Sequence, residues 1–354
     1  MMDVLSEPQL AALAGLGGGI LLGLAARLGR FCTMGAIEDA LYGGSGLRLR
    51  MWGLAISVSV VLSFGLAGLG GFEPESTIYL EQAWTPLASI LGGLMFGYGM
   101  ALAGNCGYGA LARVGGGDMK AFVVVLVMGI AAYMTVSGPI AEIRVRVFPV
   151  SIAAEPVPGI AHLGAWASGI SPLAIGLALG VLGVVASIGN SDLRRDPKAL
   201  MWSVAVAVAV VSGWAATSWI AQTGFDGLPV TSHTYSAPIG ESLLYLMTSS
   251  GSSVDFGIGS VAGVVVGAFG GSVLKGHFRW EACEDARELR RLMLGAFLMG
   301  VGAVTALGCS VGQGLSAFSV LALSAPVTFA AIFAGAALGL RHLILGAASG
   351  HRAL

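Results

Sequence analysis

Long apolar runs separated by short polar or glycine-rich stretches make up most of the chain. A helix needs about 20 mostly apolar residues to cross the hydrocarbon core of a bilayer. Nine runs have about this length, and the pattern therefore predicts nine spanning helices. Their expected ranges are 9–28, 51–71, 86–105, 119–139, 169–189, 200–220, 254–274, 291–308 and 324–346.

Four further segments look helical but are too short to span a bilayer. Irregular backbone at membrane depth is tolerated only where it is buried in protein or lines a cavity. We therefore expect these segments to follow breaks in the helices that face the interior of the protein. They are residues 33–42, 107–115, 241–249 and 310–319.

The composition agrees with a membrane protein. Charged residues make up 10% of the 354 residues and hydrophobic residues 56%, whereas soluble domains carry about 25% charged residues. The net charge is -1, and no basic patch with interleaved aromatics suggests nucleic-acid binding. The first ten residues carry Asp3 and Glu7 but no basic residue, so the first run is expected to be a retained span rather than a signal peptide.

Basic residues predict the orientation. If the N-terminus lies outside, 16 of the 18 Lys and Arg residues fall on the inner side and only Arg144 and Arg146 on the outer side. Such a bias is typical of the cytoplasmic side of a membrane protein. It predicts an odd number of spans and a cytoplasmic C-terminus. The inner residues are Arg27, Arg30, Arg48, Arg50, Arg113, Lys120, Arg194, Arg195, Lys198, Lys275, Arg279, Arg287, Arg290, Arg291, Arg341 and Arg352.

The order of long and short segments is duplicated. Residues 1–139 contain four spans, with short pieces after the first and the third, and residues 200–346 repeat this order. The span at 169–189 links the two halves and makes the second start from the opposite face. We therefore predict one transmembrane domain over 1–354, built as an inverted repeat, which places a substrate site near the midplane.

Glycines at four-residue spacing predict one close helix pair. The first span carries Gly15, Gly19 and Gly23, and the seventh carries the same spacing over four glycines. Small residues at this spacing let helix backbones approach closely in lipid. The second set is Gly259, Gly263, Gly267 and Gly271.

Three Cys-x-x-Gly motifs coincide with predicted helix breaks. They start at Cys32, Cys106 and Cys309. A thiol at a helix start faces the positive end of the helix dipole and free backbone N–H groups, and both favour an anion. Glycines inside these motifs are expected to let the chain turn sharply. The glycine three positions after each cysteine, for example Gly109 or Gly312, is expected to let the backbone come close. These thiols are candidates to hold a substrate briefly.

Polar neighbours of the cysteines have two interpretations. Asn105, Tyr108 and Gln313 either line a substrate path or satisfy backbone groups at the broken helices. Cys283 lies in a charged loop without the motif and is expected to be incidental. The five histidines are scattered and no Cys-x-x-Cys occurs, so neither a metal site nor a cofactor is expected.

The motifs together resemble the YeeE/YedE family of membrane proteins, in particular its thiosulfate-transporting members. The resemblance rests on Gly29-Arg-Phe-Cys-Thr-Met-Gly35, Gly104-Asn-Cys-Gly-Tyr-Gly109, Phe278-Arg-Trp-Glu281 and Ala306-Leu-Gly-Cys-Ser-Val-Gly-Gln-Gly-Leu315. It implies nine spans plus short helices in an hourglass-shaped, pseudo-twofold arrangement. It also implies thiosulfate uptake across the bacterial inner membrane, with Cys32, Cys106 and Cys309 holding the ion in turn.

This resemblance leaves alternatives open. The cargo could be sulfite, sulfide or a selenium compound, since the family is linked to several such substrates. A membrane sulfurtransferase or thiol oxidoreductase would use the same cysteines, but such chemistry normally needs a paired resolving cysteine, and we do not expect an enzyme. A scaffold with purely structural cysteines is the third alternative. Membrane lipid surrounds the protein, and a cytoplasmic TusA-like sulfur carrier is a partner that the family context suggests.

Overall fold

The computed structural model describes residues 6–153, 157–189, 191–282 and 285–350. Asp3, Cys283 and Arg352, which entered the sequence predictions, lie outside these residues. Within them the chain is helical throughout, with isolated bridges but no strand.

Each predicted apolar run falls on a helix. The nine corresponding helices are α1 (Glu7–Leu28), α3 (Leu47–Gly68), α5 (Pro86–Ala103), α7 (Met119–Val136), α10 (Pro172–Ile188), α12 (Pro197–Thr223), α14 (Phe256–Leu274), α15 (Ala286–Thr305) and α16 (Ser324–Gly350). The four short pieces also form. They are α2 (Thr33–Leu41), α6 (Gly107–Val114), α13 (Ala237–Thr248) and the π-helical segment η2 (Gly312–Ala317).

Seven segments of the described chain are long and apolar enough to cross a bilayer. Two of them join a long helix to the short one after it, α1 to α2 and α5 to α6. Helix α10 is shorter, with 17 residues, and α15 begins with the charged residues Arg287, Glu288, Arg290 and Arg291. The chain is therefore an all-helical, multi-pass membrane protein.

Helix starts follow from side chains that can cap them. The Asp118 carboxylate accepts hydrogen bonds from the backbone N–H groups of Lys120 and Ala121 at the start of α7. Asp196 and Asp255 cap α12 and α14 in the same way. Such caps satisfy N–H groups that have no partner within the helix. In lipid these caps fix where each helix can begin.

The close helix pair predicted from glycine spacing is α1 against α14. A Cβ atom added to Gly19 would stand 2.3 Å from the Ser260 carbonyl oxygen, and one added to Gly263 would stand 2.3 Å from that of Leu16. No side chain fits at these positions. The glycine spacing therefore predicted this contact correctly, and backbone packing in lipid explains it.

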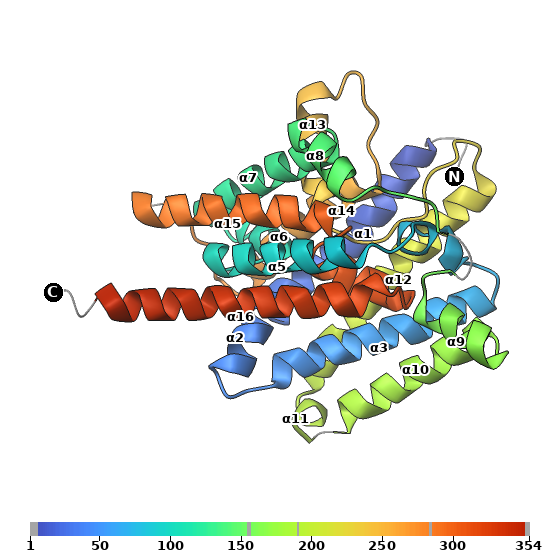
Figure 1. The fold of residues 1–354 in the computed structure, drawn as a ribbon. Coiled ribbons are helices and arrows are strands. Elements are labelled where there is room, and N and C mark those ends of the chain that lie inside the picture. The colour runs from blue at the N-terminus through green and yellow to red at the C-terminus, as the bar shows by residue number, and fades with distance from the viewer. Residues whose placement is uncertain (1–5, 154–156, 190, 283–284, 351–354) are drawn as a thin grey trace.

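The other long helices pack beside this pair in one bundle (Figure 1). Helix α5 packs against α15 and α16, α7 against α15 and α13, and α3 against α12 and α10. Helix α10, with the short α9 (Ile160–Ser168), lies at the periphery beside α3. Helix α1 begins at the end of the bundle opposite to the end where α16 stops (Figure 1).

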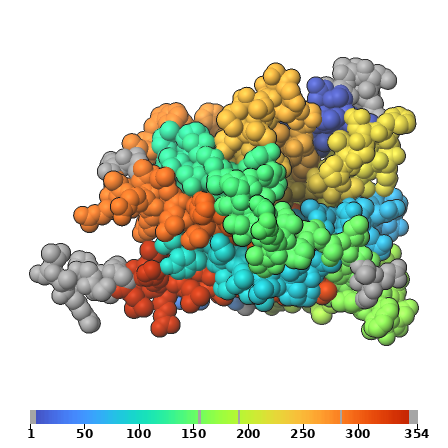
Figure 2. Space-filling view, turned by 45° about the horizontal axis from the view of Figure 1, so that its top comes forward, coloured from blue at the N-terminus to red at the C-terminus, as the bar shows by residue number. Residues whose placement is uncertain are grey.

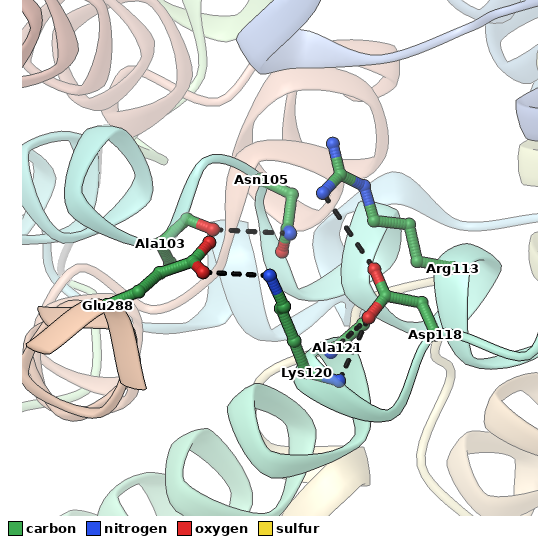
Figure 3. A network of polar contacts seen from close by, with 7 residues as sticks. All are labelled: Ala103, Asn105, Arg113, Asp118, Lys120, Ala121 and Glu288. Carbon is green, nitrogen blue, oxygen red and sulfur yellow. Dashed lines mark hydrogen bonds and ion pairs between the residues drawn. The ribbon is translucent and has the colours of Figure 1, made fainter. Parts of the chain in front are cut away.

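The segment Phe278–Glu281 pairs with the loop that follows α6. The backbone N–H groups of Arg279 and Glu281 donate to the carbonyls of Gly116 and Gly117, at 3.2 and 3.1 Å. Around this loop, Lys120 pairs with Glu288 at 2.7 Å, and Arg113 with Asp118 at 4.0 Å (Figure 3). This motif therefore fixes the end of the short helix that Cys106 begins.

Candidate functional site

The three motif cysteines lie at the starts of the short helices, as their sequence predicted. Cys32 directly precedes α2, and Cys106 directly precedes α6. The Cys106 sulfur accepts a hydrogen bond from the Gly109 N–H at 3.4 Å, and the Cys309 sulfur accepts one from the Gly312 N–H at 3.5 Å. These two sulfurs therefore act as helix caps.

Each thiol follows the same backbone turn. The residue two positions before each cysteine adopts a positive φ: 52° at Arg30, 71° at Gly104 and 57° at Leu307. Only glycine adopts this conformation without steric cost. Two of the three positions are therefore strained, and such strain persists where the surrounding structure enforces it. The turn ends the long helix and points the short one in a new direction.

The thiols are close to one another. The Cys106 and Cys32 sulfurs lie 3.7 and 3.9 Å from the point where a Cβ of Gly109 would stand. Cys106 also lies near both Cys32 and Cys309. Cys106 and Cys309 are each 1% exposed, whereas Cys32 is partly exposed. Cys106 thus lies in the interior, near both of the other motif thiols.

The polar neighbours satisfy backbone groups at the broken helices. The Tyr108 hydroxyl donates to the Leu22 carbonyl at 2.6 Å. The Gln313 amide donates to the carbonyls of Ala306 and Leu307 just after α15, at 2.8 and 3.2 Å. The Asn105 amide donates to the Ala103 carbonyl at 3.3 Å, at the end of α5 (Figure 3). The nitrogen sides of both amides thus have structural partners.

Unpaired polar atoms lie next to every thiol. The Asn105 and Gln313 side-chain oxygens are buried without a hydrogen-bond partner, as are the hydroxyls of Thr33 and Ser310. Ser310 follows Cys309 in the chain and lies beside the Cys106 thiol. A buried polar atom without a partner costs free energy, so these atoms are available to a polar ligand that reaches the thiols.

The motif glycines differ in conformation: Gly104 and Gly308, which precede the cysteines, adopt positive φ and make the expected turns, whereas those that follow the cysteines do not. Gly35, Gly109 and Gly312 all lie within helices, and the left-handed turn comes before the cysteine instead. The absent side chains of these glycines leave room for neighbouring groups. A Cβ on Gly312 would stand 2.6 Å from the Thr234 hydroxyl oxygen and 3.3 Å from that of Tyr79.

An extended segment, which we call the strap (residues 228–236), crosses the Cys309 thiol. The backbone N–H of Tyr235 donates to the Cys309 sulfur at 3.4 Å, and the Thr234 hydroxyl lies 3.7 Å from it. Tyr79 also interacts electrostatically with Cys309. Sequence reasoning missed these three residues, because the strap's polar composition is typical of an ordinary outer loop.

The strap is anchored along its length. The Ser232 hydroxyl donates to the Val210 carbonyl in α12 at 2.7 Å, and the Ser316 hydroxyl of η2 donates to the His233 carbonyl at 2.7 Å. The buried His233 ring shares a hydrogen bond of 2.6 Å with Ser260 in α14. Three helical elements therefore fix the strap against the Cys309 thiol.

A cavity of about 540 Å³ at the end of the bundle where α1 begins reaches Thr234 and Gly308, which neighbour Cys309. Its inner part is lined by Thr234, Leu307 and Gly308, and its walls include Tyr79 and the buried Trp214. Figure 2 looks onto the face where α13 (yellow-orange) and α8 (Pro139–Val147, green), which contribute to the lining, come to the surface.

Comparison with known proteins identifies the family. A sequence profile described as sulphur transport matches residues 28–338, which is most of the chain. The chain belongs to the sulphur transport family. Among curated members of known function, it is similar to the thiosulfate transporter TsuA of Spirochaeta thermophila, with 27% identity over 317 residues that cover 86% of this chain and 91% of that protein. It is also 28% identical, over 319 residues and 86% of each chain, to the thiosulfate transporter TsuA of Escherichia coli K12.

Family membership accounts for the combination of features in this chain. These relatives are named as transporters, and the matched region contains all three cysteine motifs. Within the described residues, no group of three His, Cys, Asp or Glu side chains is placed to hold a metal ion. The protein is thus a membrane protein of a sulfur-transport family whose interior contains thiols, unpaired polar atoms and helix starts.

Proposed function

We propose that this protein takes up thiosulfate across the bacterial inner membrane for sulfur assimilation, and that Cys309, Cys106 and Cys32 bind the ion in turn. The observation that carries the proposal is the proximity of three thiols at helix starts. Cys106 lies near both Cys32 and Cys309, and a cavity reaches Gly308, the residue before Cys309. The names of the two relatives support thiosulfate as the cargo.

The chemistry of the site suits a dianion with one exposed sulfur. Cys106 and Cys309 accept backbone N–H groups on their sulfur, so each S–H can donate to the anion. The adjoining helix starts offset its negative charge. A thiol is a weak hydrogen-bond donor, and a transport path needs sites that release the ion readily. No covalent bond to the sulfur is required at any step.

The neighbouring polar groups would assist this transfer. Asn105 and Gln313 satisfy helix ends through their nitrogens, and Tyr108 holds α6 against α1 through its hydroxyl. These residues position the thiols. Gly109 and Gly312 leave room for the ion, since a Cβ at either position would stand within 4 Å of a thiol or of the strap.

We further propose that the nine long helices all span the membrane and form an inverted repeat. The first repeat is 1–139, the second is 200–346, and the helix at 169–189 links them in an hourglass-like arrangement. Helix pairing supports this. If α1, α3, α5 and α7 correspond to α12, α14, α15 and α16, then the contact α1–α14 is matched by α12–α3, and α5–α16 by α15–α7.

The short helices follow the same correspondence. Helix α13 contacts α7, and its counterpart α2 contacts α16. Helix α6 packs against α7 and α14, and η2 packs against α16 and α3. These matched contacts support equivalent positions for Cys106 and Cys309, approached from opposite faces.

The proposed orientation puts the cavity outside the cell. Arg144 lies at the cavity end of the bundle, and the N-terminus would be outside with the C-terminus in the cytoplasm. The ion would then leave past Cys32 on the cytoplasmic side, where a TusA-like sulfur carrier is a plausible acceptor. Pull-down of such a carrier by the purified protein tests the last point.

Growth provides the test of the proposed function. A bacterium without its own sulfate and thiosulfate uptake systems would express this chain or its Cys309→Ala variant, with thiosulfate as the only sulfur source. We expect growth with the native chain and none with the variant at equal membrane expression. Growth on sulfite but not on thiosulfate, or uptake of a labelled selenium compound in place of thiosulfate, would favour another cargo. A stable persulfide on Cys106 detected by mass spectrometry would favour a sulfurtransferase.

A further inference from the structure

The outer cavity has charged walls that the thiol relay does not use. Of the described residues that line it, three carry charge: Arg144 on α8, Glu241 on α13 and Asp255 just before α14. All three side chains belong to residues that are partly buried. The other described lining residues are neutral, so these three groups set the electrostatic field that an ion meets before it reaches Cys309.

Arg144 is positioned to meet an anion. Its Nε donates to the Thr135 carbonyl at 3.0 Å, which fixes the guanidinium at the cavity wall. It forms no ion pair with Glu241 or Asp255 in the part of the chain that the structure describes. An arginine fork held in place and not neutralised by a carboxylate is suited to bind an oxyanion.

The nearby Arg146 differs from Arg144 in its exposure, its ion pairing and its position relative to the cavity. Its side chain is 77% exposed and pairs with Glu142 one turn earlier on α8. It does not line the cavity. The two arginines therefore form a matched pair on one helix, of which only one faces the proposed path.

The two carboxylates oppose an incoming anion. Asp255 is held by its cap on α14, where its Oδ1 accepts the Ile258 N–H at 2.8 Å. Glu241 belongs to the short helix α13, outside the seven apolar spans. Burial, and secondly the charge of Asp255, raise the pKa of the Glu241 carboxyl to about 7.

Few other ionisable groups act on Glu241. The elements packed against α13 are α7 and α14. From α7 the nearest is Tyr133, which packs against Gly240. Lys120 lies at the other end of α7. Helix α14 itself has no charged residue, so Asp255 is the charged neighbour that acts on Glu241. Arg144 lies elsewhere in the cavity lining.

We propose that this cavity is a proton-assisted capture site for a divalent sulfur oxyanion, in which Arg144 binds the anion and Glu241 must be protonated for the anion to enter. The proposal rests on the proposed function. With both carboxylates ionised, the three charged groups sum to −1; when Glu241 takes a proton from solvent, they sum to zero. By linkage, protonation and anion binding then favour each other equally.

Thiosulfate binding to the purified full-length protein tests this directly. Trp214 lines the cavity, so its fluorescence can report binding of sodium thiosulfate at pH 6 and pH 8, a range in which the ligand stays a dianion. The variants are Glu241→Gln and Arg144→Gln. Their matched controls are Glu142→Gln and Arg146→Gln, two exposed residues of α8. Gel filtration and thermal unfolding verify that each variant is folded.

We expect native affinity to fall about tenfold from pH 6 to pH 8, as a single carboxyl titrating near 7 requires. The Glu241→Gln variant should bind tightly at both pH values. The Arg144→Gln variant should bind at least about tenfold more weakly at both, a loss typical of one charge-assisted contact. Both controls should behave as the native protein does.

Two results would overturn the inference alone. One is an unchanged pH dependence in Glu241→Gln, and the other is equal affinity of Arg144→Gln and Arg146→Gln. Absence of saturable thiosulfate binding by the native protein at pH 6 would overturn the proposed function together with the inference.

Discussion

The Cys309 sulfur accepts a hydrogen bond from the backbone N–H of Tyr235 at 3.4 Å, although 74 positions separate the two residues. The bond joins the start of the helix containing η2 to the strap. The Ser316 hydroxyl joins the same two elements a second time through the His233 carbonyl, at 2.7 Å. The position of the outermost thiol therefore depends on a segment that has no regular secondary structure.

Removal of the second bond tests this dependence. Ser316→Ala should lower the free energy of unfolding by about 1 kcal/mol, the usual net value of one hydrogen bond, and should slow uptake because the strap moves relative to Cys309. Ser203→Ala is the control, since its hydroxyl bonds only to the Ala199 carbonyl within α12. Thermal unfolding and uptake rates measure both effects. Equal uptake by the two variants would show that the strap does not position the thiol.

A second prediction follows from the lack of room for a side chain at Gly312. A methyl group there would stand 2.6 Å from the Thr234 hydroxyl oxygen, so Gly312→Ala should push the strap from Cys309 and reduce thiosulfate uptake strongly. In contrast, Gly17→Ala in α1 meets no atom within 4 Å and should leave uptake unchanged. Uptake into proteoliposomes at equal protein content measures both. Native-like uptake by Gly312→Ala would contradict this account of the site.

The contact between α1 and α14 makes a third prediction. Gly263→Ala places a Cβ 2.3 Å from the Leu16 carbonyl oxygen, which forces two backbones apart. It should destabilise the protein by about 1–3 kcal/mol, as overpacking usually does. Gly270→Ala, on the same helix with open space around it, should not. The melting temperatures of the two purified variants measure this difference in stability. Equal melting temperatures would argue against close packing at this contact.

Much of the fold followed from patterns that physics ties directly to structure. Apolar runs located all nine long helices, and glycines such as Gly19 and Gly263 located the closest helix pair, because only small residues permit such contacts in lipid. The cysteines were correctly placed at helix starts. Their mutual proximity was not predictable from spacing, since Cys106 and Cys309 lie in different halves of the chain.

The finer geometry of the site could not be predicted, because the local sequence carries no signal for it. The left-handed turn before each thiol falls on Arg30 and Leu307 as well as on Gly104, and two of these residue types give no signal for it. Thr234, Tyr235 and Tyr79 reach Cys309 only through tertiary packing.

The most direct test of the central claim is the initial rate of labelled thiosulfate uptake into proteoliposomes containing the Cys106→Ala variant. Cys283→Ala, which removes a thiol outside the three motifs, is the control. The account predicts that Cys106→Ala loses at least about tenfold in rate, equivalent to roughly 1.4 kcal/mol of lost interaction, while Cys283→Ala transports as the native protein does. Equal rates for the two variants would contradict a path through the thiols.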